Sequence, residues 1–363
     1  MPSTQPRNVF RVLSIDGGGF RGLYTATLLN TLARRFSENS DVPLDIGKKF
    51  DLIVGTSTGG ILACALAAGI PINDISNIYV KHGKDIFSNP QPENKLKLLF
   101  WGCANKRKNS CDAGKLNAIL KSTFSDTTIK QIYTNRNIAL CIPTIDAVTH
   151  HPWVFKTPHN KGKNRDDNYS LVDVCMATSA APIYFPIHEC ASPDNKAGKQ
   201  FFVDGGLWAN NPVLIGMAEA LQINQNKEIE IISIGTLPAP VGSVIQKVRR
   251  GLLDWKFGAE ALLLGMDAQA SGYDYTAQFL ATSLSGKCTV IRIDKNKVCP
   301  SPDQAKCLAM DAADDCNISV LTKLAESAAD RIHGEEMAKI NRGEISIIAD
   351  IFQNLTPLKV DGK

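Results

Sequence analysis

Residues 50–66 read FDLIVGTSTGGILACAL, an apolar strand that runs through a Gly-x-Ser-x-Gly turn into an alanine-rich helix. This order of strand, sharp turn and helix is typical of a nucleophile elbow, in which a serine hydroxyl stands exposed on a strained turn. Ser57 is therefore a candidate nucleophile, and Gly55 and Gly59 would let the two elements approach closely. The pentapeptide alone is a weak signal, so the apolar elements on both sides of it carry the prediction.

A second strand and glycine-rich turn lie near the N-terminus, where residues 9–22 read VFRVLSIDGGGFRG. The strand ends at Asp16, and apolar residues at helical spacing follow the glycines. Successive glycines between a strand and a helix let backbone amides converge into a small anion-binding concavity. The amides of Gly17, Gly18 and Gly19 are therefore suited to hold the oxyanion of a tetrahedral acyl intermediate.

The same glycines, at residues 17–22, also satisfy the Gly-x-Gly-x-x-Gly fingerprint of dinucleotide-binding proteins. That fingerprint expects an acidic residue about 20 positions later, at the end of the second strand. Here the second strand runs directly into the Ser57 turn, and Asp41 and Asp45 lie in a predicted loop. We therefore predict no bound dinucleotide cofactor.

A third glycine-containing turn closes residues 201–206, which read FFVDGG. Asp204 would face the Ser57 turn if their strands are neighbours, and Gly205 and Gly206 would leave room around its carboxylate. Taken alone, Asp-Gly-Gly is an ordinary turn sequence.

Together these three motifs resemble, in order and spacing, those of the patatin-like phospholipase family, the lipid acyl hydrolases of bacteria and plants. Two further stretches are similar to the family pattern, ATSAAPIYFP at residues 177–186 and Asn-Asn-Pro at residues 210–212. The resemblance covers roughly residues 9–236. It implies a phospholipase A, a carboxylic ester hydrolase, in which Ser57 is the nucleophile and Asp204 its only side-chain partner.

The resemblance also makes the backbone of Gly17, Gly18 and Gly19 the oxyanion hole, and it implies no metal. The residues that support the motifs are Arg21, Gly22, Gly55, Gly59, Gly205 and Gly206. Arg21 would either steady the glycine loop or meet a lipid phosphate, and we favour the first role.

The six histidines of the chain are consistent with a Ser-Asp dyad, because none lies in a stretch that marks a triad base. His188 and His333 are expected to be structural or exposed. A free aspartate has a pKa of about 3.9, so the dyad needs an apolar environment that raises the pKa of Asp204. One rival is an α/β-hydrolase esterase with a Ser-Asp-His triad, for which His333 would be the available base. Another is a catalytically inactive lipid- or nucleotide-binding module whose glycines merely make turns.

Strands and helices alternate along the chain, which predicts an α/β fold with a mainly parallel central sheet and helices on both faces. The expected strands are 9–15, 50–54, 136–145, 152–156, 201–204, 229–235 and 288–293. The expected helices are 21–37, 58–69, 72–86, 112–123, 170–179, 211–223, 244–281 and 317–341. We divide the chain into a catalytic core, residues 9–236, and a C-terminal helical and strand extension, residues 237–363, packed on it.

Composition excludes several classes. The 363-residue chain has a net charge of +4, which gives no case for DNA or RNA as a partner. It contains no apolar run long enough to span a membrane and starts without an apolar signal segment, so we expect a cytoplasmic protein. Of its ten cysteines, three (Cys299, Cys307 and Cys316) share a predicted loop. These three could pair or bind metal, but we expect free thiols, and we expect Cys64, Cys141 and Cys175 to be small core residues.

Two segments look like additions to the catalytic core, and a third is a basic loop. Residues 88–111 combine LKLLFW with Lys106-Arg107-Lys108, which suits docking on an anionic membrane but equally suits an amphipathic helix packed on the core. Residues 246–255 open the predicted long helix, and there we favour core packing. Residues 161–165 form a basic loop that is either merely solvated or contacts a phosphate-bearing regulator.

The whole-chain layout resembles one subgroup of the family, the bacterial phospholipase effectors that a cyclic dinucleotide activates in antiphage defence. This resemblance implies cyclic GMP-AMP as an allosteric activator and the phospholipid of the cell's own membrane as substrate. It also implies an autoinhibited resting enzyme that forms a homo-oligomer on activation and then acts at the inner face of the membrane. An unregulated lipid acyl hydrolase is the alternative.

Overall fold

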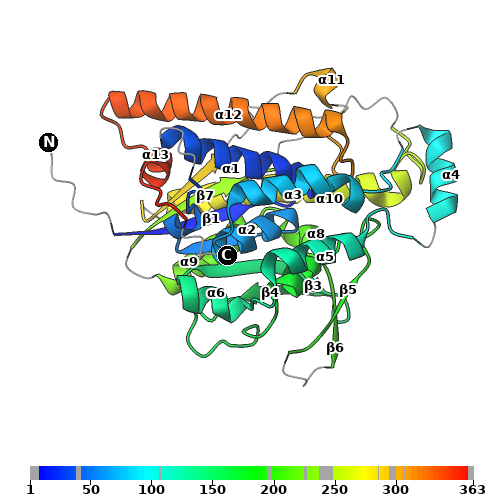
Figure 1. The fold of residues 1–363 in the computed structure, drawn as a ribbon, viewed down its shortest axis with the longest axis horizontal. Helices are drawn as coiled ribbons and strands as arrows, with labels where there is room; N and C mark the ends of the chain where they lie inside the picture. The colour runs from blue at the N-terminus through cyan, green and yellow to red at the C-terminus, as the bar shows by residue number, and fades with distance from the viewer. Residues whose placement is uncertain are drawn as a thin grey trace.

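The fold is built on a sheet with the strand order β5-β6-β3-β2-β1-β7-β8, to which β4 adds by pairing with β3 (Figure 1). The computed structural model describes residues 8–37, 42–92, 94–105, 108–193, 198–224, 227–236, 248–284, 286–293, 300–305 and 307–358. The strands are β1 Val9–Ile15, β2 Leu52–Gly55, β3 Ala139–Asp146, β4 His151–Lys156, β5 His188–Ala191, β6 Lys199–Asp204, β7 Glu228–Ile234 and β8 Cys288–Ile293. The longer helices are α1 Gly22–Phe36, α2 Thr58–Ala68, α3 Ile72–Ile86, α4 Lys95–Asn105, α5 Ala113–Phe124, α9 Val213–Ile223, α10 Ala259–Ser283 and α12 Asp315–Asn341. The shorter helices are α6 Ile129–Arg136, α7 Leu171–Thr178, α8 Gly206–Ala209, α11 Pro302–Ala305 and α13 Ile347–Phe352.

The five strands β3, β2, β1, β7 and β8 are parallel to one another. The strands β4, β6 and β5 join this block in antiparallel pairing. The predicted α/β fold with a mainly parallel sheet is therefore confirmed. The carboxyl ends of β1 and β2 meet at one edge of the sheet, as open parallel sheets place their sites.

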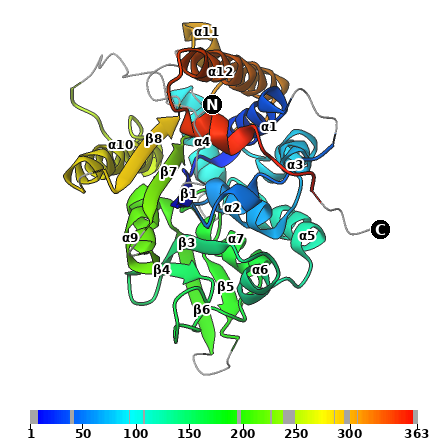
Figure 2. The ribbon, with the colours of Figure 1, turned by 90° about the vertical axis from the view of Figure 1, so that its left-hand side faces the viewer.

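Both faces of the sheet are buried, which explains the nearly continuous apolar sequence of its central strands. Along β1, Leu13 and Ile15 point into the larger core beneath α1 and α2, while Phe10 and Val12 point into a smaller core beneath α9 and α10. This alternation follows from the two-residue period of a strand. Figure 2 shows α9 and α10 on one side of the sheet and α1, α2 and α3 on the other.

The C-terminal part of the chain joins the same sheet and the same core. Strand β8 lies parallel to β7, and α12 lies along α1, with which it makes an extensive contact (Figure 1). Three of the seven buried residues of α12 are alanines, Ala325, Ala328 and Ala329. Short side chains on this face let the axes of α1 and α12 approach closely.

The long helix predicted over residues 244–281 is wrong in its first part. Residues 237–247 lie outside the described residues, and α10 begins only at Ala259. The backbone of Lys256, Phe257 and Gly258 has positive φ values of 44°, 56° and 96°, which no right-handed helix accommodates. Before this turn Leu252 is 68% exposed, so the core packing expected for residues 246–255 is wrong at this position.

The expectation of free thiols is wrong for two of the three clustered cysteines. Cys307 and Cys316 form a disulfide, with their Cα atoms 5.7 Å apart. A turn between α11 and α12 brings them together, which a spacing of nine residues does not reveal. Cys299 lies outside the described residues. Cys64, Cys141 and Cys175 are buried, as predicted for small core residues.

We predict that the double variant Cys307→Ser/Cys316→Ser loses about 2–4 kcal/mol of unfolding free energy, because the disulfide restricts the unfolded chain. Urea denaturation measures this loss, and dithiothreitol should weaken the parent protein equally while leaving the double variant unchanged. Cys103→Ser is the matched control, since Cys103 is an exposed free cysteine. Alkylation of Cys307 and Cys316 in the unreduced, denatured protein would contradict the disulfide.

Candidate active site

Ser57 lies between β2 and α2 with φ 54° and ψ −124°, outside the regions that residues with a side chain favour. The strained turn predicted from the Gly-x-Ser-x-Gly sequence is thus present. A Cβ on Gly59 would lie 2.4 Å from the carbonyl oxygens of both Ile15 and Asp16. Only glycine at this position lets the start of α2 pack against the end of β1.

Thr178, at the end of α7, holds the backbone of Ser57 in this turn. The Ser57 amide donates to Thr178 Oγ1 at 3.0 Å, and that hydroxyl donates to the Pro143 carbonyl at 2.6 Å. This chain of hydrogen bonds is buried and ties Ser57 to β3. The family-like motif at residues 177–186 marked this segment in the sequence. It did not predict that the Thr178 side chain would bind the Ser57 backbone.

Asp204 ends β6, and the carboxylate is almost wholly buried, with 2% of the residue exposed. Its Oδ1 accepts the Gly206 amide at 2.6 Å, while Oδ2 is buried and has no hydrogen-bond partner. Burial raises the pKa of Asp204 to about 7, because desolvation outweighs the opposing effects of the Gly206 amide and the nearby Ser57 hydroxyl. Such a carboxylate is poised to exchange a proton at neutral pH.

The glycine loop is anchored where it leaves β1. The amides of Asp16 and Gly17 donate to the carbonyls of Ile234 and Asn210, at 3.0 and 2.9 Å. Because the Gly17 amide is used in this way, the expectation that Gly17 serves as an oxyanion donor is corrected. Within the described residues the amides of Gly18 and Gly19 make no such bond, and both glycines line the cavity that contains Ser57.

Gly19 has a φ of +57°, and a Cβ there would lie 2.5 Å from the carbonyl oxygen of Met310. The same carbonyl accepts the Phe20 amide at 2.9 Å, so the disulfide-closed turn that carries Met310 supports the glycine loop. Arg21 is buried beside this loop. Burial lowers the pKa of its guanidinium, although the nearby charge of Asp267 acts in the opposite direction.

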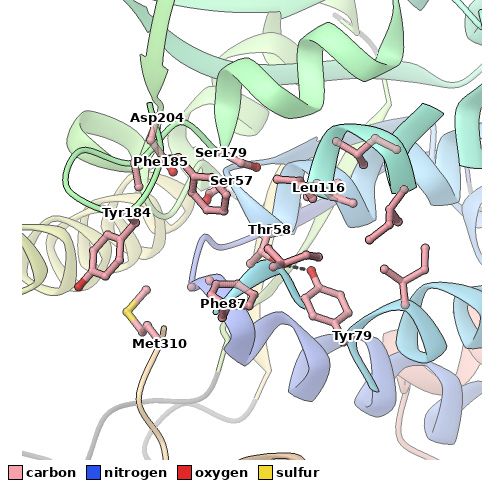
Figure 3. Close-up of a pocket in the computed structure, with 18 of the residues that line it drawn as sticks. Ser57, Thr58, Tyr79, Phe87, Leu116, Ser179, Tyr184, Phe185, Asp204 and Met310 are labelled. Carbon is pink, nitrogen blue, oxygen red and sulfur yellow. Dashed lines mark hydrogen bonds between the residues drawn. The ribbon is translucent and has the colours of Figure 1, made fainter. Parts of the chain in front are cut away.

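A narrow apolar cavity, here called the Ser57 cavity, contains both Ser57 and Asp204 (Figure 3). Helices α2, α3, α5 and α10 supply most of its walls. Its apolar lining consists mainly of Ile61, Ile75, Ile78, Ile86, Phe87, Leu116, Ile119, Leu120, Phe185, Leu262, Leu263, Met266 and Met310. By its apolar composition this cavity, with a volume of about 90 Å³, suits the ester end of a fatty acyl chain, with the ester at Ser57.

No histidine is among the described residues that line the Ser57 cavity. His188 Nε2 lies 3.1 Å from Asp173, and His333 packs edge-on against Phe36. The geometry of the cavity therefore favours a Ser-Asp pair over a triad. The two described side-chain groups with metal-ligand geometry, around His159 and around His188, also lie outside this cavity.

A family model described as patatin-like phospholipase matches residues 13–217. The chain belongs to this family. Patatin-like phospholipases are carboxylic ester hydrolases, the enzyme class that the motifs predict.

Three relatives illustrate the match. A cGAMP-activated phospholipase of Vibrio cholerae serotype O1 is 36% identical over 242 residues, 64% of this chain and 65% of the relative. A cGAMP-activated phospholipase of Pseudomonas aeruginosa is 34% identical over 272 residues, 73% of this chain and 74% of the relative. Patatin-like protein 1 of Oryza sativa subsp. indica is 28% identical over 371 residues, 94% of this chain and 85% of the relative. The alignment thus spans less than two thirds of the Vibrio cholerae relative.

Helix α4 lies in the segment predicted either to dock on membrane or to pack on the core of this patatin-like chain. Leu98 is buried, and Trp101 donates from its ring nitrogen to Asn89 at 2.9 Å, so one side packs inward. Phe100, by contrast, is 74% exposed. Residues 106 and 107 lie outside the described residues. No helix in the described ranges is long and apolar enough to cross a bilayer.

The basic loop at residues 161–165 is only partly free to meet a regulator. Arg165 donates to Asp166 at 2.7 Å, and its guanidinium lies 3.7 Å from the centre of the Trp153 ring. Arg165 is therefore held by the protein itself, whereas Lys161 and Lys163 are exposed.

The pKa of Asp204 predicts a pH-dependent rate. Asp204 accepts a proton only when ionised, so kcat/KM for a nitrophenyl ester should rise about tenfold per pH unit below pH 7 and level off above it. Because the pKa of Asp204 is higher in the folded protein than in the unfolded chain, ionisation of Asp204 destabilises the fold. The free energy of unfolding that Asp204 contributes therefore decreases as the pH rises from about 4 to about 7. Asp204→Asn should therefore unfold at a higher temperature than the parent at pH 8. A flat rate profile between pH 5 and pH 8 would contradict Asp204 as the base.

Proposed function

We propose that this protein is a phospholipase that hydrolyses acyl esters of membrane phospholipids with Ser57 as nucleophile and Asp204 as base. One observation carries the proposal: a serine on a strained turn and a buried carboxylate with a pKa of about 7 line the same apolar cavity. The membership of the chain in the patatin-like phospholipase family supports it.

The reaction follows from these positions. Asp204 Oδ2, the oxygen without a partner, accepts the proton of the Ser57 hydroxyl as Oγ attacks the ester carbonyl carbon. The amides of Gly18 and Gly19 then donate to the oxyanion of the tetrahedral intermediate. When this intermediate collapses, the ester C–O bond breaks and the leaving alcohol takes the proton from Asp204. Water attacks the acyl-enzyme with Asp204 again as base, which releases the fatty acid and restores Ser57.

We predict that Ser57→Ala and Asp204→Asn each lower hydrolysis of a nitrophenyl ester by at least ~10³-fold, and that the double variant is scarcely slower, because the two groups act as one unit. Circular dichroism checks that the variants fold. Ser122→Ala is the matched control, since Ser122 is exposed on α5 and bonds only within its own helix. Turnover near the parent rate by Asp204→Asn would overturn the dyad.

Regulation by a cyclic dinucleotide is the second element of the proposal. It is supported by the relatives from Vibrio cholerae and Pseudomonas aeruginosa, both named cGAMP-activated phospholipases. We infer that cyclic GMP-AMP activates this enzyme, that activation accompanies assembly into a homo-oligomer, and that the enzyme then degrades the inner face of the membrane in antiphage defence. The exposed outer side of α4, with Phe100, is the surface we assign to membrane contact.

We predict that cyclic GMP-AMP binds the protein and raises its hydrolysis of phospholipid vesicles at least tenfold, because an activator shifts a resting population by its higher affinity for the active form. Calorimetry measures binding, and light scattering reports assembly. Phe100→Ser should weaken vesicle binding without changing nucleotide binding. Full activity without nucleotide, together with no binding of any cyclic dinucleotide, would leave an unregulated lipid acyl hydrolase.

A further inference from the structure

A second cavity, here called the polar cavity, adjoins the Ser57 cavity. It has a volume of about 700 Å³ and lies between α5, α7 and residues 185–189. Leu116, Ser179 and Phe185 line both cavities, so these three side chains form the boundary between them. A group held in the polar cavity therefore lies next to the end of the Ser57 cavity where an ester would react.

Ser179 carries a hydroxyl that the fold does not use. The residue is 6% exposed, and its Oγ is buried without a hydrogen-bond partner. Figure 3 shows Ser179 at the wall of the Ser57 cavity, close to Ser57 itself. A buried hydroxyl without a partner is unfavourable for folding, so a ligand that accepts a hydrogen bond at this boundary would relieve the cost.

The polar cavity holds a fixed negative charge at Asp173. The Ser170 hydroxyl donates to Asp173 Oδ2 at 2.7 Å, and His188 Nε2 lies 3.1 Å from Oδ1. These hydrogen bonds lower the pKa of Asp173 although burial opposes ionisation. Asp173 therefore presents a carboxylate to the cavity throughout the neutral range.

The rest of the lining makes the charge balance negative. Among the described residues of the lining, Asp126 and Glu189 add two carboxylates, while Lys121 supplies an ammonium group. Glu189 also pairs with the exposed Lys199 at 2.6 Å, outside the cavity lining. The cavity thus offers Lys121 as a cationic contact for a phosphate. Its anionic contacts for an amine are Asp126, Asp173, which His188 of the same lining also contacts, and Glu189, which also pairs with Lys199.

We propose that the polar cavity is the headgroup subsite of the phospholipase and that it selects zwitterionic, amine-bearing glycerophospholipids. This inference rests on the proposed function. The acyl chain occupies the apolar Ser57 cavity, so the alcohol half of the ester lies across the boundary in the polar cavity. There Ser179 donates a hydrogen bond to the glycerophosphate, Lys121 meets the phosphate, and Asp173 with Glu189 meets the ammonium group. A cyclic dinucleotide fits this cavity poorly, because its two phosphates would face three carboxylates.

The test compares hydrolysis of phosphatidylethanolamine and phosphatidylglycerol with identical acyl chains, each dispersed in neutral detergent micelles, with saturating cyclic GMP-AMP. The parent enzyme should favour phosphatidylethanolamine about tenfold in kcat/KM, which corresponds to about 1.4 kcal/mol. Asp173→Asn and Glu189→Gln should each reduce this ratio severalfold. The exposed Glu326→Gln on α12 is the matched control and should leave the ratio unchanged.

Ser179→Ala provides an independent measurement. Its kcat/KM should fall about tenfold more on phosphatidylethanolamine than on nitrophenyl butyrate, which has no headgroup to bond. A purely structural hydroxyl would give equal losses on both substrates. If Asp173→Asn does not fold, Glu189→Gln still tests the inference, because Glu189 is exposed and its substitution should leave the fold intact.

The outcomes separate this inference from the proposed function. If the parent hydrolyses both lipids equally, or if the ratio is unmoved in Asp173→Asn and Glu189→Gln, the headgroup subsite is overturned while the phospholipase stands. If the parent hydrolyses neither lipid nor nitrophenyl butyrate, the proposed function fails and the subsite fails with it. If Asp173→Asn or Lys121→Glu instead abolishes cyclic GMP-AMP binding, the cavity belongs to the regulator and the inference is overturned.

Discussion

The site depends on one backbone constraint, the strained positive-φ conformation of Ser57. A residue with a side chain adopts this conformation only where the surrounding structure enforces it. Here β1 and α2 enforce this conformation through their close approach at Gly59. Thr178 also enforces it, because its hydroxyl accepts a hydrogen bond from the Ser57 amide. The parallel pairing of β1 with β2 is therefore needed for more than the core, since it brings the glycine loop and Ser57 to the same edge of the sheet.

Electrostatics then determine what the strained serine can do. An exposed aspartate would be a poor base at pH 7, because its pKa lies far below that pH. Asp204 escapes this limit because the apolar Ser57 cavity desolvates it, while the Gly206 amide keeps one of its oxygens oriented. The same lining that suits an acyl chain thus raises the pKa of the base. Substrate binding and basicity have a common physical origin in this cavity.

The sequence predicted the parts of this arrangement that local patterns encode. Strand β1, helix α3 and strand β8 occur at the predicted bounds, because each has clear apolar periodicity and sharp ends. The expectation that Ser57 and Asp204 converge came from their positions at strand ends, and both line one cavity.

What the sequence did not predict depends on long-range contacts. The amide of Gly17 is satisfied by the carbonyl of Asn210, a residue far along the chain, so no local pattern could remove it from the oxyanion donors. The disulfide between Cys307 and Cys316 depends on a turn whose shape the surrounding fold sets. The start of α10 was misplaced because a helical spacing of apolar residues also occurs in the non-helical turn before it. The short strand β5 was missed because its pairing with β6, and not its own composition, defines it.

The C-terminal third of the chain contributes directly to the site, although the motifs all lie before it. Arg292, on β8, donates to Asp16 Oδ1 at 2.8 Å and to Ser233 at 2.7 Å, so a buried ion pair anchors the residue that begins the glycine loop. Met310 supports the other end of the loop through the Phe20 amide and lines the Ser57 cavity. Removing one partner of a buried ion pair leaves an uncompensated charge, which makes such a pair an effective positional constraint. The oxyanion donors are therefore positioned both by the motif-bearing segment and by β8 with the disulfide-closed turn. A chain ending near residue 236 would lack the contacts from β8 and from this turn.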